Sequence, residues 1–192
     1  MPYSTVALLL LLSVPNQLPA TCRPIDRPDE VYRAATTVCF LGPLLKDTRS
    51  CSVANTGEVA NFDIPLSVRT CFDCWGRPPE SEGSPGSFFG FTGDQGTRLT
   101  VSLHDFASIA GMEIEQNFLV GSFPIVASFR AQNGEELLRI ERILSGRASA
   151  RLFAVGCDGP VIDSVLIEAP PEALGFAIAF VRSDAFIHSL LK

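Results

Sequence analysis

Two glutamates, two positions apart, are the residues of this chain best suited to acid–base chemistry. Glu113 and Glu115 lie in the alternating stretch Met112-Glu113-Ile114-Glu115. In a β-strand they would share one face, with Cα atoms about 6.5–7 Å apart from the strand rise. Carboxyl groups paired at such spacings catalyse glycoside hydrolysis. Any solvated strand with two glutamates has the same geometry, so we predict a solvent-facing surface here. We keep both residues as candidate binding residues and assign no catalytic residue.

Few other side chains suggest chemistry. His104 follows a predicted strand and His188 lies near the end of the sequence, and we expect both in surface or turn positions. No Gly-x-Ser-x-Gly elbow marks a nucleophile. No phosphate-binding loop, dinucleotide fingerprint or zinc-protease motif occurs, so the sequence predicts no cofactor and no metal site. The missing motifs favour a non-enzymatic protein, and an enzyme stays an open alternative.

Trp75 is the single tryptophan. Between Cys74 and Gly76 it is a candidate binding residue, because an exposed indole can stack on a sugar ring. The alternative is an indole packed against a disulfide, and the surrounding residues favour the packed arrangement.

An even number of cysteines predicts a disulfide framework of unknown pairing. The six are Cys22, Cys39, Cys51, Cys71, Cys74 and Cys157. If all of them pair, at least one bridge must join Cys157 to the first part of the chain. The spacing Cys71-x-x-Cys74 also fits a redox pair or half of a zinc site. The Pro-rich residues that follow it cannot continue a helix, which favours disulfides.

Residues 1–20 have the features of a secretory signal peptide. They carry no charged side chain, contain the apolar run Val6–Leu12, and end in Leu18-Pro19-Ala20. The alternative is a buried N-terminal strand or helix. The sequence therefore predicts a secreted or extracellular product, periplasmic in a Gram-negative cell. No later apolar run reaches membrane length, so no transmembrane anchor is predicted.

The net charge of −6 narrows the range of partners. A protein that binds nucleic acid needs a basic face to neutralise the phosphates, and a protein that binds an anionic membrane needs one as well. We therefore predict no nucleic-acid partner. The sequence leaves the oligomeric state open.

The composition of the chain changes near residue 87. Residues 21–87 are rich in Pro and Cys and predict an irregular N-terminal arm, packed on or linked to the rest. Residues 88–192 contain short apolar segments separated by turn residues, which is typical of an antiparallel sandwich or barrel. We predict strands near 88–92, 98–103, 111–118, 124–131, 136–143, 150–156, 161–168 and 175–182. Residues 135–144 also have helical spacing, but the Asn133-Gly134 turn before them favours a hairpin strand.

Residues 88–187 resemble the jelly-roll, lectin-like modules of secreted bacterial proteins. The matching pieces are 126–134, 152–156, 163–167 and Gly175-Phe176-Ala177-Ile178-Ala179, where the family usually has Asp in place of Ala179. The resemblance implies a jelly-roll-like β-sandwich that binds glycans or serves in surface adhesion.

The sequence thus predicts an all-β, jelly-roll-like sandwich with a Cys- and Pro-rich arm. We expect a secreted, non-enzymatic binding or structural module whose partner is a glycan or an extracellular protein. Two alternatives stay open. A small polysaccharide hydrolase would place Glu113 or Glu115 in a groove beside aromatic side chains. A secreted effector or inhibitor would expose an apolar patch around Trp75 and Pro78-Pro79.

Overall fold

The computed structural model describes residues 20–42, 47–54, 57–70, 75–83, 85, 89–92, 96–116, 121–145 and 148–186. The predicted signal peptide, Cys71, Cys74 and His188 lie outside these residues, apart from Ala20. The strands are β1 (Cys22–Ile25), β2 (Thr37–Val38), β3 (Asp47–Val53), β4 (Gly57–Arg69), β5 (Phe89–Phe91), β6 (Arg98–Ala107), β7 (Ile109–Gln116), β8 (Ser122–Arg130), β9 (Glu136–Ser145), β10 (Arg151–Cys157), β11 (Ile162–Glu168) and β12 (Phe176–Ser183). The helical elements are α1 (Glu30–Ala35) and the short 3-10 helix η2 (Pro171–Ala173).

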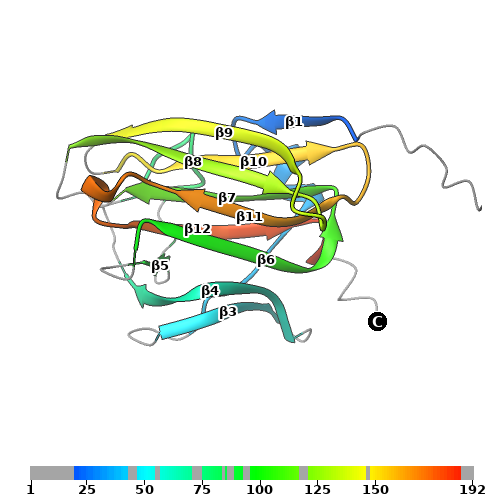
Figure 1. Cartoon of the computed structure of the whole chain (residues 1–192), viewed down its shortest axis with the longest axis horizontal. Helices are drawn as coiled ribbons and strands as arrows, with labels where there is room; N and C mark the ends of the chain where they lie inside the picture. Colours follow the sequence, from blue (N-terminus) through cyan, green and yellow to red (C-terminus); the bar gives the residue numbers. More distant parts are fainter. Residues whose placement is uncertain are drawn as a thin grey trace, which may run out of the picture.

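Two antiparallel sheets pack as a sandwich (Figure 1). The first has the order β1-β10-β7-β12-β5 and the second β4-β6-β11-β8-β9, and β5 also pairs with β4. From β5 onward the chain crosses between the sheets at every step except the β8–β9 hairpin. The resulting orders, β10-β7-β12-β5 and β6-β11-β8-β9, are the connectivity of an eight-stranded jelly roll. The predicted all-β, jelly-roll-like sandwich is confirmed.

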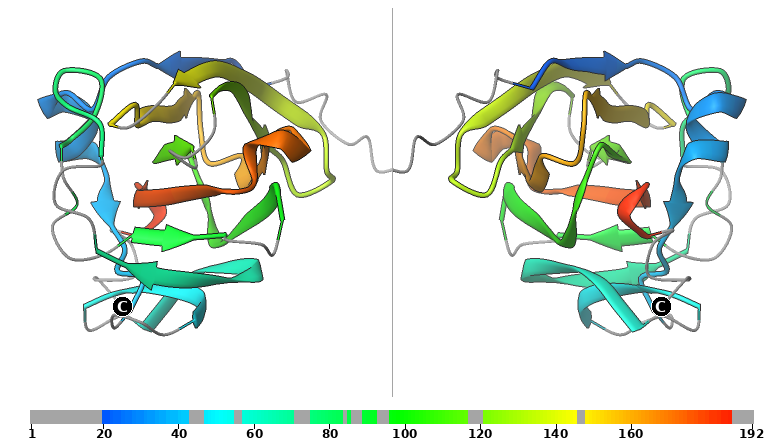
Figure 2. Two further views of the ribbon diagram at one scale, coloured as in Figure 1. Left: turned by 90° about the vertical axis from the view of Figure 1, so that its left-hand side faces the viewer. Right: turned by 90° about the vertical axis from the view of Figure 1, so that its right-hand side faces the viewer.

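Alternating side chains explain why these segments form a sandwich. In β6, Leu99 and Val101 point into the core while Ser102 is exposed, and in β8, Ile125, Ala127 and Phe129 point inward. One buried cluster runs through both sheets and fills the interior seen end-on in Figure 2. Burying one apolar face of each sheet is the main driving force for this arrangement.

The strand interpretation of residues 135–144 is also confirmed. They form β9, which pairs with β8 along its whole length. The turn before them contains Gly134 with φ +82°, a left-handed conformation that glycine adopts without strain. Its N–H donates to the carbonyl of Ala131 at 2.9 Å.

The N-terminal arm is less irregular than its composition predicted. Between residues 21 and 87 the chain contributes β1 to β4, and β4 alone has 13 residues. The prediction of an irregular segment is therefore wrong for these stretches. Isolated prolines misled it, because Pro65 lies inside β4 and Pro24 inside the edge strand β1, where a missing N–H is tolerated. Phe62 and Leu66 of β4 belong to the same buried cluster as the later strands.

The two ends of the strand path approach each other. Arg142 of β9 contacts Asp26, just after β1, at 2.9 Å, and its guanidinium lies 5.7 Å from the ring centre of Phe153.

Among the described helices, none has the length and apolar character needed to cross a membrane.

Candidate functional site

The outer face of β7 carries both candidate glutamates. Met112 and Ile114 point into the core, so Glu113 and Glu115 project from the opposite side of the strand. The shared face was predicted correctly, but its exposure was not. Glu113 is 0% and Glu115 3% exposed. The prediction of a solvated surface is wrong because residues 75–83 and 148–150 contact the two carboxylates there.

Glu113 fastens residues 75–83 to the sheet. Its Oε2 accepts hydrogen bonds from Trp75 Nε1 and Ser81 Oγ, each at 2.6 Å. Its Oε1 accepts one from the backbone N–H of Glu82. Burial raises the pKa of Glu113 to about 7, although these hydrogen bonds act in the opposite direction. This carboxyl group therefore keeps its proton to a higher pH than an exposed glutamate does.

Glu115 is held by the residues before β10. Its Oε1 accepts from the backbone N–H and the hydroxyl of Ser149, both at 3.1 Å. Its Oε2 is buried and has no hydrogen-bond partner in the part of the chain that the structure describes. Burial raises the pKa of Glu115 to about 7, partly offset by hydrogen bonds from Ser149 and Ala150 and by the charge of Arg151.

Trp75 packs rather than projects. It is 3% exposed and clusters with Ala150, Ala177 and Ala179. Ala177 lies opposite Glu115 and Ala179 opposite Glu113 in the β12–β7 register, so small side chains flank both glutamates and leave room for the indole. The indole is therefore packed, as the favoured interpretation predicted, but against these alanines; Cys74, whose disulfide was the predicted contact, lies outside the described residues. In this conformation the indole is not an exposed platform for a sugar.

Arg182 reaches this face through an irregularity in β12. The β12–β7 register shifts between Ala179 and Arg182, and Phe180 has φ +49°. Val181 consequently points into the core, and Arg182 takes the outward position that strict alternation would give its neighbour. Arg182 donates from Nε and Nη2 to the carboxylate of Glu82 at 2.7 and 2.9 Å.

Tyr32 completes the polar cluster. Helix α1 begins after Asp29, whose side chain accepts from the N–H of Tyr32 at 2.8 Å. The ring packs against Leu152 and Ala154 of β10. Burial raises the pKa of Tyr32 far above its usual range, and its hydroxyl has no hydrogen-bond partner among the described residues. Glu82, Glu113 and Arg182 are the charges that act on it.

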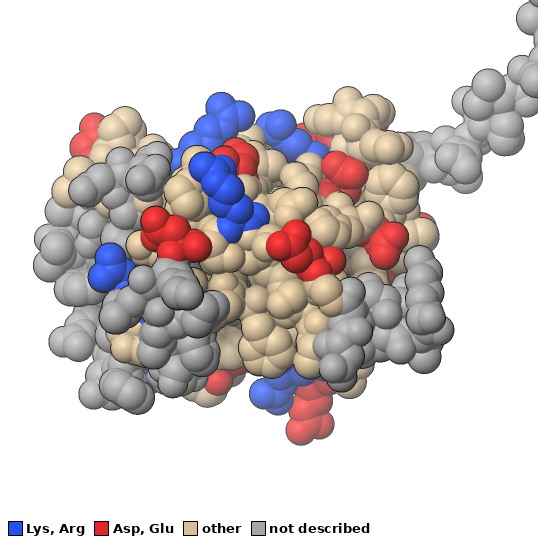
Figure 3. Space-filling model, turned by 90° about the horizontal axis from the view of Figure 1, so that it is seen from below, with Lys and Arg blue, Asp and Glu red and all other residues tan. Residues whose placement is uncertain are grey.

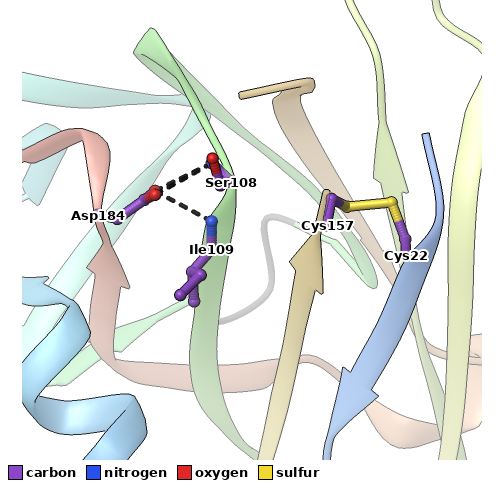
Figure 4. The surroundings of a disulfide bond; sticks show 5 residues. All are labelled: Cys22, Ser108, Ile109, Cys157 and Asp184. Carbon is purple, nitrogen blue, oxygen red and sulfur yellow. Dashed lines mark hydrogen bonds between the residues drawn. A yellow bond between two sulfur atoms is a disulfide. The ribbon is translucent and has the colours of Figure 1, made fainter. Parts of the chain in front are cut away.

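Two disulfides join cysteines of the described residues. Cys22 of β1 pairs with Cys157 of β10, and Cys39 pairs with Cys51 of β3. The first confirms that Cys157 bonds to the front of the chain. Figure 4 shows it beside the β6–β7 turn, where Asp184 accepts from the N–H groups of Ser108 and Ile109, both at 3.0 Å. Within the described part of the chain, no group of His, Cys, Asp and Glu side chains could hold a metal ion.

Sequence reasoning missed several members of this cluster. Ser81, Glu82 and Ser149 lie in turn-like stretches whose contacts have no sequence signal. Arg182 did have a sequence signal. It is a lone arginine at the end of the apolar strand Phe176–Val181, and a charge in such a position needs a partner. His104 lies exposed on β6, as expected.

Searches against protein families and curated proteins return no match for this chain. The site comprises two carboxyl groups with raised pKa values, one enclosed indole and one buried ion pair, gathered on the outer face of β10, β7 and β12.

Proposed function

We propose that this protein is a secreted, non-enzymatic binding or structural module that recognises a glycan or another extracellular surface. The observation that carries the non-enzymatic part is the enclosure of Glu113. Both of its oxygens accept hydrogen bonds, and the residue is 0% exposed. A general acid or nucleophile must touch its substrate, and a carboxylate held in this way has no room for one.

The outer face of the second sheet supports the binding part. Ser164 of β11 lies opposite Ser102 of β6 and Arg130 of β8, and Leu166 lies opposite Thr100. Because Val101, Val165 and Phe129 point into the core, the residues paired beside them point outward. Ser102 is exposed and Thr100, Ser164 and Arg130 are half-buried, whereas Leu166 on the same face is buried. Arg130 is half-buried, and its Nε is enclosed without a hydrogen-bond partner within the described residues, so only the rest of its guanidinium could meet a ligand. Hydroxyl and guanidinium groups are suitable hydrogen-bond partners for a hydroxyl-rich glycan.

Charge and disulfides fit the same proposal. On the face shown in Figure 3, basic and acidic side chains are interspersed, without the continuous basic surface that nucleic acid requires. Disulfides persist in oxidising compartments, and two join described residues of this chain.

Export and binding need separate tests. The intact mass of the product exported by an expressing cell should correspond to a chain beginning at or near Thr21, and reduction should raise it by two hydrogens for each disulfide. A product that retains residues 1–20 with free thiols would overturn the secreted assignment.

A glycan array tests the binding part, with the purified protein applied to it. Arg130→Ala should weaken a positive signal, whereas Arg33→Ala, at an exposed position of helix α1, should leave it unchanged.

A polysaccharide hydrolase is the second candidate, because two neighbouring carboxyl groups have pKa values of about 7. It requires a conformation in which residues 75–83 leave Glu113 open to the substrate. Values in this range suit a general acid at neutral pH. Hydrolysis of a polysaccharide that Glu113→Gln and Glu115→Gln both abolish would favour this candidate over the binding module. The effector alternative predicted an exposed apolar patch around Trp75, and the burial of Trp75 removes that residue from any such patch.

A further inference from the structure

We propose that Phe106 is the stacking platform for a neutral oligosaccharide on the outer face of the second sheet, and that an irregularity in β6 places its ring there. The inference rests on the proposed function, because it names the sugar-contacting residue and the ligand class of that same face.

Strand β6 leaves its regular pairing near its carboxyl end. Ser102 pairs with Ser164 of β11. The next pair of the register joins Ala107 to Ile162, so five residue steps along β6 correspond to two along β11. On the other side of β6, the pairing with β4 ends at Leu103. Extra residues of this kind form a β-bulge, which bends a strand and re-aims its side chains. Figure 1 shows the bend at the arrowhead end of β6.

The bulge exposes an aromatic ring. Leu103 packs against the core and Ala107 is fully buried, whereas all three residues between 104 and 106 are exposed. Phe106 is 44% exposed. A phenyl ring on the surface of a sheet offers a flat apolar area, and the rigid strand beneath it keeps the ordering cost of binding low.

Hydrogen-bonding groups lie along the same stretch. His104 and Asp105, next to Phe106 in the sequence, are both exposed. On the neighbouring strand β11, Asp163 and Ser164 are half-buried where the register with β6 shifts. A sugar has an apolar ring face of C–H groups and a rim of hydroxyl groups. It can therefore stack on a phenyl ring while its hydroxyl groups bond to side chains of these types.

Charge and distance define the class of ligand. Acidic and basic groups occur together on this face, Asp105 and Asp163 with Arg130 of β8, so it favours neither an anionic nor a cationic ligand. Phe106 lies four residues beyond Ser102, which is about 13 Å along a strand and less around the bend. A ligand that contacts both residues is longer than one sugar ring. We therefore expect a neutral oligosaccharide.

The experiment applies the exported, oxidised protein to an array of neutral mono-, di- and tetrasaccharides. Calorimetric titration then uses the free oligosaccharide with the strongest signal. Oligosaccharides should bind more tightly than the monosaccharides that compose them. Phe106→Ala should weaken binding by roughly tenfold, because the apolar contact with the ring is lost. Phe106→Trp should retain binding, since indole is also a flat ring.

Phe40→Ala is the matched control. It also removes an exposed phenyl ring, 58% exposed, but from the connection between β2 and β3, and it should leave the affinity unchanged. Circular dichroism establishes that each variant is folded.

The outcomes separate this inference from the proposed function. If the wild-type protein binds an oligosaccharide and Phe106→Ala binds it equally well, the platform is wrong and the glycan-binding function stands. If the wild-type protein binds no glycan on the array, both fail. Should Phe106→Ala not fold, Phe106→Leu decides the question, because leucine keeps an apolar side chain without a flat ring. Binding by Phe106→Leu as tight as that of the wild type would refute the platform.

Discussion

Glu82 and Arg182 lie 100 residues apart in the sequence and form a two-pronged ion pair on the outer face of the first sheet. Their side chains are only 8% and 13% exposed, unlike those of the other ion pairs in the described residues. A buried pair of this kind does not have to add net stability, but removing one partner leaves an uncompensated charge.

Arg182→Ala should therefore destabilise the protein strongly. The expected loss is about 3–5 kcal/mol, because the carboxylate of Glu82 is left buried without its cation. Urea unfolding, followed by circular dichroism, measures it. The matched control is Arg98→Ala, which breaks a pair whose side chains are 65% and 44% exposed and should cost about 0–1 kcal/mol. Equal losses in the two variants would contradict the role assigned to burial.

The two disulfides should contribute unequally. Cys22–Cys157 spans 135 residues and Cys39–Cys51 spans 12. In the chain-entropy account, closing the longer loop restricts the unfolded chain more, by about 5 kcal/mol against about 3 kcal/mol. The double variant Cys22→Ser/Cys157→Ser should thus unfold at lower denaturant than Cys39→Ser/Cys51→Ser. The reverse order would show that native packing, rather than loop closure, dominates.

Global stability should fall as the pH rises from about 5 to about 7. Glu113 and Glu115 have pKa values of about 7 when folded, whereas an unfolded glutamate has its ordinary value near 4.5. Between these values the folded protein holds protons that the unfolded chain releases, so the free energy of unfolding decreases with pH and levels off above 7. Melting temperatures at pH 5.5 and 8 test this. A combined Glu113→Gln/Glu115→Gln variant should show a smaller difference between them.

Gly111 should not tolerate a side chain. It lies opposite Ala154 in the β7–β10 pair, and a Cβ there would come within 2.8 Å of the Phe153 carbonyl oxygen and of Ala154 Cα. Backbone atoms cannot move aside cheaply, so Gly111→Ala should cost about 1–3 kcal/mol or more. Gly156→Ala is the control on the neighbouring strand, because its nearest contact would be Ile25 Cδ1 at an ordinary 3.6 Å. Thermal unfolding of both variants distinguishes the two outcomes.

The strands of the sandwich could be predicted because their signal is local. Alternation in Leu99–Leu103 and the turn at Asn133-Gly134 indicate strand and hairpin without knowledge of the partner. The strands of the arm lack such a signal. Pro65 interrupts β4, and β1 is an extended edge whose structure depends on pairing with β10. Their formation is a tertiary effect.

The candidate site, too, could be predicted only in part. Period-two alternation placed Glu113 and Glu115 on one face, as the structure shows. Alternation does not reveal whether another part of the chain covers that face. Trp75 and Ser81 reach Glu113 from 38 and 32 residues away, through a stretch whose sequence indicates only a loop. The raised pKa values were for that reason inaccessible to sequence reasoning.

The pairing of β1 with β10 has a consequence for how the chain is made. Synthesis is vectorial, so β1 leaves the ribosome while its partner, on the far side of a 135-residue separation, has not yet been translated. Until then the Cys22 thiol has only Cys39, Cys51 and other early cysteines to react with. Correct maturation must therefore delay or reverse oxidation at Cys22, which makes the yield of this protein sensitive to the disulfide isomerase activity of the compartment in which it folds.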